Sequence, residues 1–203
     1  MIDQAILEEA IKIISTEGDY ADIYIEERSS LTIRLEESRI EKISSGTERG
    51  AGLRIIRNFK TFYAHTDDLS RKSILELARD LKNLAKIGGE VTGGKDLVIE
   101  KKNPFSFNPP PDFRILIRPD DVPLNKKTSL LLEADRLARS SPLIRQVTIN
   151  YGDTVKRVKI INSSGREVED ERIYTTFIIH VIGASDGELQ TAYESIGGLV
   201  GFE

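Results

Sequence analysis

The sequence has no cysteine and no tryptophan, and its only methionine is Met1. Without cysteine, the chain has no disulfide, no thiolate ligand for a metal and no cysteine nucleophile. No apolar run reaches the roughly 20 residues that a membrane-spanning helix needs. The first residues also lack the basic and then apolar pattern of a signal peptide. We therefore expect a protein of a reducing compartment, the cytoplasm.

An excess of positive charge is also missing. The 29 Lys and Arg residues face 33 Asp and Glu residues, and the formal net charge is −4. Proteins that bind DNA directly usually carry a basic surface, so direct nucleic-acid binding is not expected. With 203 residues, of which 39% are hydrophobic, the chain has the composition of a globular protein that buries a substantial core.

The first part of the chain has the pattern of two helices that enclose several strands. Apolar residues at helical spacing predict helices over residues 3–16 and 70–86. Alternating apolar residues predict strands at residues 21–26 and 30–36, with a polar turn at residues 26–29. Residues 44–50 are expected to form a glycine-rich turn that leads into another strand. Further strand signals are Ile40 and Ile43, Leu53 to Ile56, and Phe62 and Tyr63, with a turn at Asn58.

The last part repeats the combination of helix and strands. A helix is predicted over residues 125–140, because its apolar residues form a stripe and Pro142 follows. Alternation then predicts a series of antiparallel strands separated by short turns. The expected strands are residues 144–151, 155–162, 166–170, 173–184 and 188–193, with turns at Gly152-Asp153, at residues 162–165 and at residues 185–187.

Between these parts, residues 88–124 hold four glycines close together and all but one of the 7 prolines. This segment is either a structureless linker or an ordered arm that packs Phe105, Phe107 and Phe113; exposed aromatic residues are not typical of a purely disordered segment, which favours a partly ordered connector. We predict an α+β protein. Its antiparallel sheet flanked by helices (1–87) is followed by the proline-rich connector (88–124) and a second region of a helix plus long antiparallel strands (125–203).

Several motifs occur in a fixed order along the chain. Residues 44–54 read Ser-Ser-Gly-x-x-Arg-Gly-x-Gly-x-Arg, and residues 66–70 read Thr-x-Asp-Leu-Ser before a helix. The glycine spacing alone would also suit an ordinary hairpin. The ordered set, however, resembles the TldD/PmbA family of metallopeptidases, once called modulators of DNA gyrase, and the TldD branch more than the PmbA (TldE) branch. The later motifs are Leu132 to Arg136, Val147 to Ile149, Asn162-Ser163-x-Gly165, Glu169 to Arg172, and Tyr193-Glu194-x-x-Gly197-Gly198-x-x-Gly201-Phe202.

This resemblance implies a zinc metallopeptidase subunit that acts on peptides or unfolded segments. The family's metal motif is His-Glu-x-x-x-His, but His65 precedes Thr66 and His180 precedes Val181. We therefore expect no catalytic residue and no metal ligand in this chain, and zinc only in the intact family member. We interpret the chain as the N-terminal part of a TldD-like protein that shapes the substrate chamber and contacts a TldD/PmbA-type subunit in a homo- or hetero-oligomer.

The resemblance also singles out residues with structural or interface roles: Ser45, Gly46, Arg49, Gly50, Gly52, Arg54 and Asp68. Gly197, Gly198 and Gly201 are candidates for a peptide cleft, and they lack the lysine and spacing of a phosphate-binding loop. His65 and His180 are either contact residues or ordinary structural residues, and the second interpretation is favoured. The acidic residues 167–171 lack the pattern of a calcium loop, which favours a solvated turn.

Two other function classes remain. The chain is alternatively a non-catalytic binding or assembly module of the PmbA (TldE) type, because it holds no recognisable catalytic constellation. A direct modulator of gyrase is less favoured, because the charge is balanced.

Overall fold

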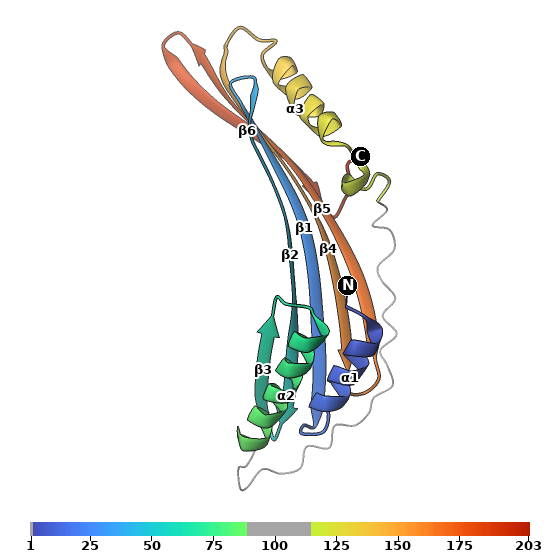
Figure 1. Cartoon of the computed structure of the whole chain (residues 1–203). Coiled ribbons are helices and arrows are strands. Elements are labelled where there is room, and N and C mark those ends of the chain that lie inside the picture. The colour runs from blue at the N-terminus through green and yellow to red at the C-terminus, as the bar shows by residue number, and fades with distance from the viewer. Residues whose placement is uncertain (1, 89–114) are drawn as a thin grey trace. The chain divides into compact units, whose positions relative to one another are not determined.

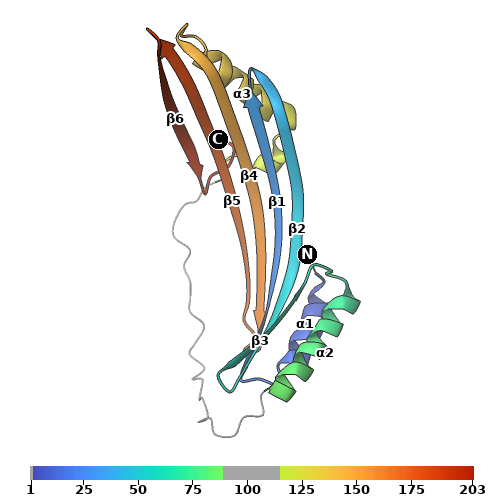
Figure 2. The same ribbon diagram turned by 90° about the vertical axis from the view of Figure 1, so that its left-hand side faces the viewer.

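The computed structural model describes residues 2–88 and 115–203 (Figure 1). Helix α1 (Gln4–Ile14) begins where the Asp3 carboxylate accepts a hydrogen bond from the Ala5 N–H at 3.0 Å. Helix α2 (Arg71–Gly88) begins after Ser70, whose hydroxyl accepts from the Ser73 N–H at 3.3 Å. Both caps satisfy amides that have no partner within the helix. Figure 2 shows the two helices side by side.

The strands form one antiparallel sheet in the order β3-β2-β1-β4-β5-β6. The expected α+β class, with an antiparallel sheet, helices and a second helix-plus-strand region, is confirmed. A 3-10 turn (Pro119–Asp121) precedes helix α3 (Leu124–Ala138). The strands are β1 (Tyr20–Glu36), β2 (Arg39–Arg57), β3 (Lys60–Thr66), β4 (Ile144–Asn162), β5 (Glu167–Ser185) and β6 (Glu188–Gly198).

Several predicted turns are wrong because the strands are longer than expected. Residues 26–29 lie inside β1, and residues 44–50 lie inside β2. Gly152 and Asp153 likewise lie inside β4, and residues 166–170 join 173–184 in one strand, β5. The two predicted strands of β1 have the same alternation, since Ile23, Ile25, Ile33 and Leu35 are all odd-numbered and all buried. Because the same side of the alternation stays buried in both segments, they form one continuous strand without a turn between them.

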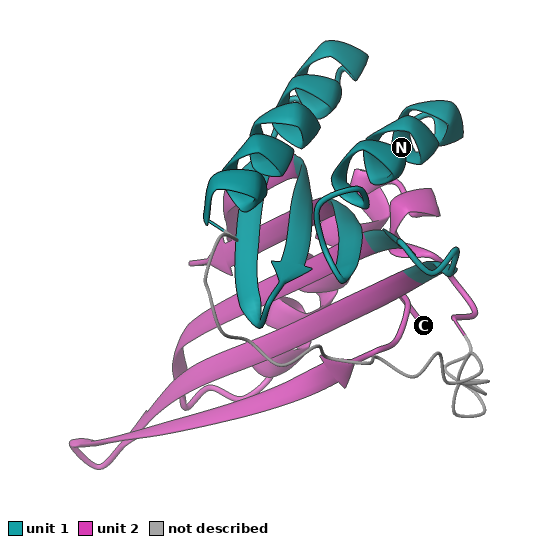
Figure 3. Ribbon diagram, turned by 90° about the horizontal axis from the view of Figure 1, so that it is seen from below, with its two compact units in different colours: residues 1–27, 48–109, 157–170 teal, residues 28–47, 110–156, 171–203 magenta. Residues whose placement is uncertain are grey.

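The chain divides into two compact units, which are coloured separately in Figure 3. Unit 1 comprises residues 1–27, 48–109 and 157–170, and unit 2 comprises residues 28–47, 110–156 and 171–203. Strands β1, β2, β4 and β5 contribute residues to both units. The expected division of the chain at residues 87 and 125 stays a prediction. Residues 89–114, with Phe105, Phe107 and Phe113, lie outside the described residues.

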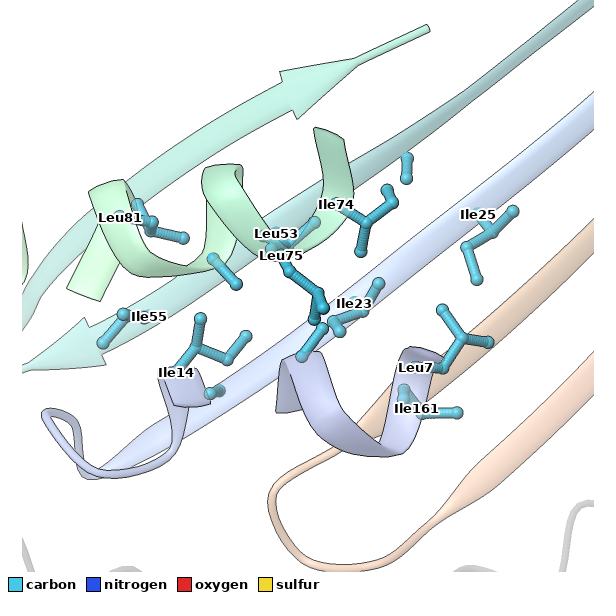
Figure 4. Close-up of a cluster of buried hydrophobic side chains, with 14 of the residues drawn as sticks. Leu7, Ile14, Ile23, Ile25, Leu53, Ile55, Ile74, Leu75, Leu81 and Ile161 are labelled. Carbon is cyan, nitrogen blue, oxygen red and sulfur yellow. The ribbon is translucent and has the colours of Figure 1, made fainter. Parts of the chain in front are cut away.

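Each unit has its own hydrophobic core. In unit 1, α1 and α2 cover one face of the strands (Figure 4). In unit 2, Leu131 of α3 packs with buried side chains of β1 and β4, among them Ile33 and Ile149. None of the helices in the described ranges is long and apolar enough to cross a membrane. The buried residues of the first core include Leu7, Ile14, Ile23, Ile25, Leu53, Ile55, Ile74, Leu75, Leu81 and Ile161.

Candidate functional site

The glycine-rich part of β2 borders a hollow of about 310 Å³ in unit 1. Gly52 lies below the Tyr63 ring, and a Cβ atom built on Gly52 would stand 2.5 Å from the Tyr63 hydroxyl oxygen. Glycine therefore leaves the room that the ring occupies. The Tyr63 ring stacks on His65 with centroids 5.8 Å apart. Other lining residues are Tyr24, Glu26, Glu48, Arg49, Gly50 and Asp67.

Arg54 has a structural contact that the sequence motif does not reveal. Its guanidinium forms an ion pair with Asp22, and its Nε lies 3.1 Å from Asp22 Oδ2. Asp22 is buried and the Arg54 side chain is 45% exposed, so this pair joins β2 to β1 at the border between buried and exposed parts of unit 1. The hydrogen bond to Asp22 raises the pKa of Arg54 above its usual value. Two parallel bonds to a carboxylate fix the guanidinium more firmly than a single charge would.

Among the other motif residues of this region, Asp68 makes a hydrogen bond within its own segment, and Ser45, Gly46 and Gly50 lie along β2. The Asp68 carboxylate accepts from the Ser70 N–H at 2.9 Å, and so it orders the residue that caps α2. Ser45 and Gly46 are exposed on β2, and a Cβ atom on Gly46 would meet no atom within 4 Å. Gly50 lies closer to β3, because a Cβ atom on Gly50 would stand 3.2 Å from the Thr66 carbonyl oxygen.

A second hollow of about 400 Å³ lies in unit 2; we call it the Thr175 pocket. Leu130 and Ala134 of α3 line it together with Phe177 of β5 and Ile196 of β6. Thr175 also lines it, and the Thr175 hydroxyl oxygen is buried with no hydrogen-bond partner among the described residues. A buried hydroxyl without a partner costs about 1–3 kcal/mol. The remaining lining residues are Tyr151, Gly197, Val200, Gly201, Phe202 and Glu203.

The three candidates for a peptide cleft, Gly197, Gly198 and Gly201, lie at this pocket or beside it. A Cβ atom on Gly201 would stand 2.2 Å from the Ile117 carbonyl oxygen, so the two backbones approach too closely for any other residue. On Gly197 the same atom would stand 2.4 Å from the Thr175 carbonyl oxygen. Gly198 is the cross-strand partner of Thr175, and a Cβ atom there would meet nothing within 4 Å.

The last residues close one wall of the Thr175 pocket. The Phe202 N–H donates to the Ile117 carbonyl at 2.8 Å, and the Phe202 ring meets Tyr151 edge-on at 6.0 Å. The Glu203 carboxylate accepts from the N–H groups of Ile117 and Gly201, at 3.0 and 3.1 Å. Backbone hydrogen bonds, first that of Ile117, lower the pKa of Glu203 to about 2.

Beside the pocket lies a buried ion pair that sequence reasoning missed. The Lys127 ammonium donates to Asp153 Oδ2 at 2.5 Å, and the Tyr151 hydroxyl donates to the same oxygen at 2.7 Å. The Lys127 and Asp153 side chains are only 4% and 8% exposed. Burial, and then the hydrogen bond to Asp153, raise the pKa of Tyr151 well above its usual value. The only signal in the sequence was the alternation of this strand, which places Asp153 on the same face as the apolar residues Val147 and Ile149.

The acidic residues of β5 pair with basic side chains and lie in a strand, not in the predicted turn. Glu167 and Glu169 both pair with Lys159, at 2.6 and 2.9 Å, and Glu171 pairs with Arg118 at 2.6 Å. The hydrogen bond to Lys159 lowers the pKa of Glu167.

Each of the two histidines stacks on a tyrosine ring. His65 stacks on Tyr63, and the His180 ring stacks on Tyr193 with centroids 5.5 Å apart. Within residues 2–88 and 115–203, no group of three or more His, Cys, Asp and Glu side chains is placed to hold a metal ion. These residues therefore do not fit a zinc site, which needs about four ligands.

Models of two protein-family domains match this chain. The model of the PmbA/TldA metallopeptidase domain 1 matches residues 21–85, and that of the PmbA/TldA metallopeptidase central domain matches residues 117–203. The chain belongs to the PmbA/TldD family. The resemblance read from the ordered sequence motifs is thereby confirmed.

Relatives of this PmbA/TldD chain include named metalloproteases. Metalloprotease MJ0996 of Methanocaldococcus jannaschii is 26% identical over 199 residues, which are 97% of this chain and 42% of the relative. The Metalloprotease TldD homolog of Haemophilus influenzae is 24% identical over 188 residues, which are 91% of this chain and 37% of the relative. The chain thus spans less than half the length of the relatives it matches.

Solved structures share the fold. TldE from Thermococcus kodakarensis superposes with a TM-score of 0.71 at 16% identity, over 95% of this chain and 42% of that protein. A protein of Bacteroides thetaiotaomicron, described as a candidate modulator of DNA gyrase, superposes with a TM-score of 0.73 at 15% identity, over 98% and 46% of the two chains. At these identities the likeness concerns the fold alone.

Proposed function

We propose that this chain is the first and central part of a TldD-like zinc metallopeptidase subunit that acts on peptides or unfolded segments. The observation that carries the proposal is the match of two consecutive PmbA/TldA metallopeptidase domains, in order, along the chain. The names of the relatives from Methanocaldococcus jannaschii and Haemophilus influenzae support it. The catalytic motif and the zinc ligands would come from outside the described residues.

The role of this part is to bind extended peptide along a strand edge. Strand β6 ends the strand order, so its outer edge pairs with no other strand of the described ranges. Every residue of β6 is exposed, and Leu189, Tyr193 and Ile196 are each more than 70% exposed. An unpaired edge offers a row of N–H and C=O groups, which bind an extended peptide with little regard to sequence.

The same part would contact a second subunit of the TldD/PmbA type, in a homo- or hetero-oligomer. The likeness to the solved TldE fold supports this assignment. Ser45, Gly46 and Arg49, which are exposed on β2, are the residues that we assign to that contact. A cytoplasmic location remains part of the proposal and rests on the absence of cysteine.

Zinc content and hydrolysis of an unfolded peptide test the proposal. Both are measured for this chain and for the protein read to the natural end of its gene. We expect zinc and cleavage in the longer protein only, because this chain lacks a metal site in its described residues. Peptidase activity of this chain with added zinc would contradict the division of labour.

A second candidate is a non-catalytic binding or assembly module. The shared fold with TldE favours it, as does the lack of a metal site among the residues that the structure describes. If the longer protein neither binds zinc nor cleaves peptide, even with a candidate partner subunit present, this second function takes the place of the first. A gyrase modulator that binds DNA would instead need a DNA affinity that falls steeply with salt.

A further inference from the structure

The Thr175 pocket gives the proposed peptide-binding edge a means to select one side chain. We infer that the pocket accepts a long apolar side chain with a terminal hydroxyl, a tyrosine, from an extended peptide paired with β6. This inference rests on the proposed function, since it requires a peptide along that edge.

The first support is the chemistry of the pocket. Thr175 is 8% exposed, and the Thr175 hydroxyl oxygen has no partner among the described residues. The walls are apolar, with Leu130, Phe177 and Ile196 among them. Among the described lining residues Glu203 alone is charged, and backbone N–H groups already occupy its carboxylate. A ligand group that suits these walls is apolar along its length and offers one hydrogen bond at its end.

The second support is the register of β5 and β6. Phe177 faces Ile196 and Thr175 faces Gly198, and the side chains of facing residues share one side of a sheet. Gly198 therefore places no side chain between Thr175 and the free edge. A Cβ atom there would meet nothing within 4 Å, so the space is open.

Strand spacing then decides the length of the ligand side chain. Neighbouring strands lie about 4.8 Å apart, so a peptide strand beside β6 lies about 10 Å from β5. A side chain of that peptide has to cross the position of Gly198 to reach the Thr175 hydroxyl. Serine, threonine and valine are too short for this distance. Lysine is long enough, but its charge would lose its hydration against the apolar walls.

The test measures peptide binding to the chain in the absence of zinc. The probes are fluorescein-labelled dodecapeptides of Gly, Ser and Ala with one central Tyr, Phe, Lys or Ala, and the readout is fluorescence anisotropy. We expect Tyr to bind about three- to tenfold more tightly than Phe, the worth of one net hydrogen bond. Lys and Ala should bind more weakly than both.

Two variants and two matched controls locate the effect. Thr175→Val keeps the shape of the side chain and should abolish the preference for Tyr over Phe, while Phe affinity is kept. Thr176→Val, which changes the neighbouring side chain on the other side of β5, should leave the preference intact. Ala134→Leu should fill the pocket and abolish the preference for aromatic probes. Ala138→Leu, one turn further along α3 and not among the pocket residues, should not.

The outcomes separate this inference from the proposed function. If the four probes bind equally, the edge binds peptide and only the pocket inference fails. If Thr175→Val keeps the Tyr preference, or Thr176→Val loses it as well, the assignment to the Thr175 hydroxyl is overturned. If no probe binds at all, the peptide-binding role of β6 fails too.

Discussion

Replacing Lys127 by methionine is the perturbation whose effect follows most directly from the structure. Lys127→Met keeps the length of the side chain and removes the ammonium group that lies 2.5 Å from Asp153. Asp153 would then be left as a buried charge that keeps the hydrogen bond from the Tyr151 hydroxyl but has lost its ammonium partner. Removing one member of a buried ion pair costs about 3–5 kcal/mol, because the other member stays without compensation.

For a chain of this size, 1 kcal/mol corresponds to about 2–4 °C, so the unfolding midpoint should fall by about 6–20 °C. Urea and thermal unfolding, followed by circular dichroism, measure the loss. The matched control is Lys126→Met, which changes an exposed lysine of the same helix and should stay within about 0.5 kcal/mol. The double variant Lys127→Met, Asp153→Asn removes the orphaned charge and keeps an acceptor for Tyr151, so it should recover most of the loss.

A loss below about 1 kcal/mol in Lys127→Met would refute this reasoning, because that is the worth of a surface ion pair. So would equal losses in the Lys127 and Lys126 variants. A double variant no more stable than Lys127→Met alone would show that the uncompensated Asp153 charge is not the cause.

Two further predictions concern the walls of the Thr175 pocket. Gly201→Ala would place a Cβ atom 2.2 Å from the Ile117 carbonyl oxygen, so it should lower the unfolding free energy by about 1–3 kcal/mol in urea unfolding. The control Gly46→Ala should change the unfolding free energy little, and equal losses in the two variants would contradict the account. Because the pKa of Tyr151 is raised in the folded state, the unfolded chain loses this proton first as pH rises above about 10. The unfolding free energy should therefore fall more steeply with pH in the native chain than in Tyr151→Phe, and parallel pH profiles would be the contrary result.

Alternation in the sequence predicted the buried faces of the strands better than it predicted their ends. Ile23 and Leu35 lie on the apolar side of the alternation that predicted strands at residues 21–26 and 30–36, and both are buried. The polar residues 26–29 between them suggested a turn, yet the unchanged phase across them was itself a sign of one long strand. Glycine-rich residues 44–50 misled in the same way, because glycine marks turns but also occurs in strands where another group approaches closely.

The pocket residues could not be found from the sequence, because their partners are remote. Asp153 followed a glycine and looked like a turn residue; its burial depends on Lys127, 26 residues away. Thr175 is one threonine among several, and only the register that places Gly198 opposite it makes it distinctive. The ordered motifs, in contrast, did predict the family, because their order can be read from the sequence without knowing which residues are in contact.

Hydrogen–deuterium exchange of the chain, with and without an unfolded peptide, tests the central claim most directly. If extended peptide pairs with the free edge of the sheet, the outward-facing amides of β6 should exchange more slowly when peptide is present, because they become hydrogen-bonded. The amides of α1 and α2 should not change. Protection confined to other elements, or none at concentrations where the labelled probes bind, would contradict the role of β6.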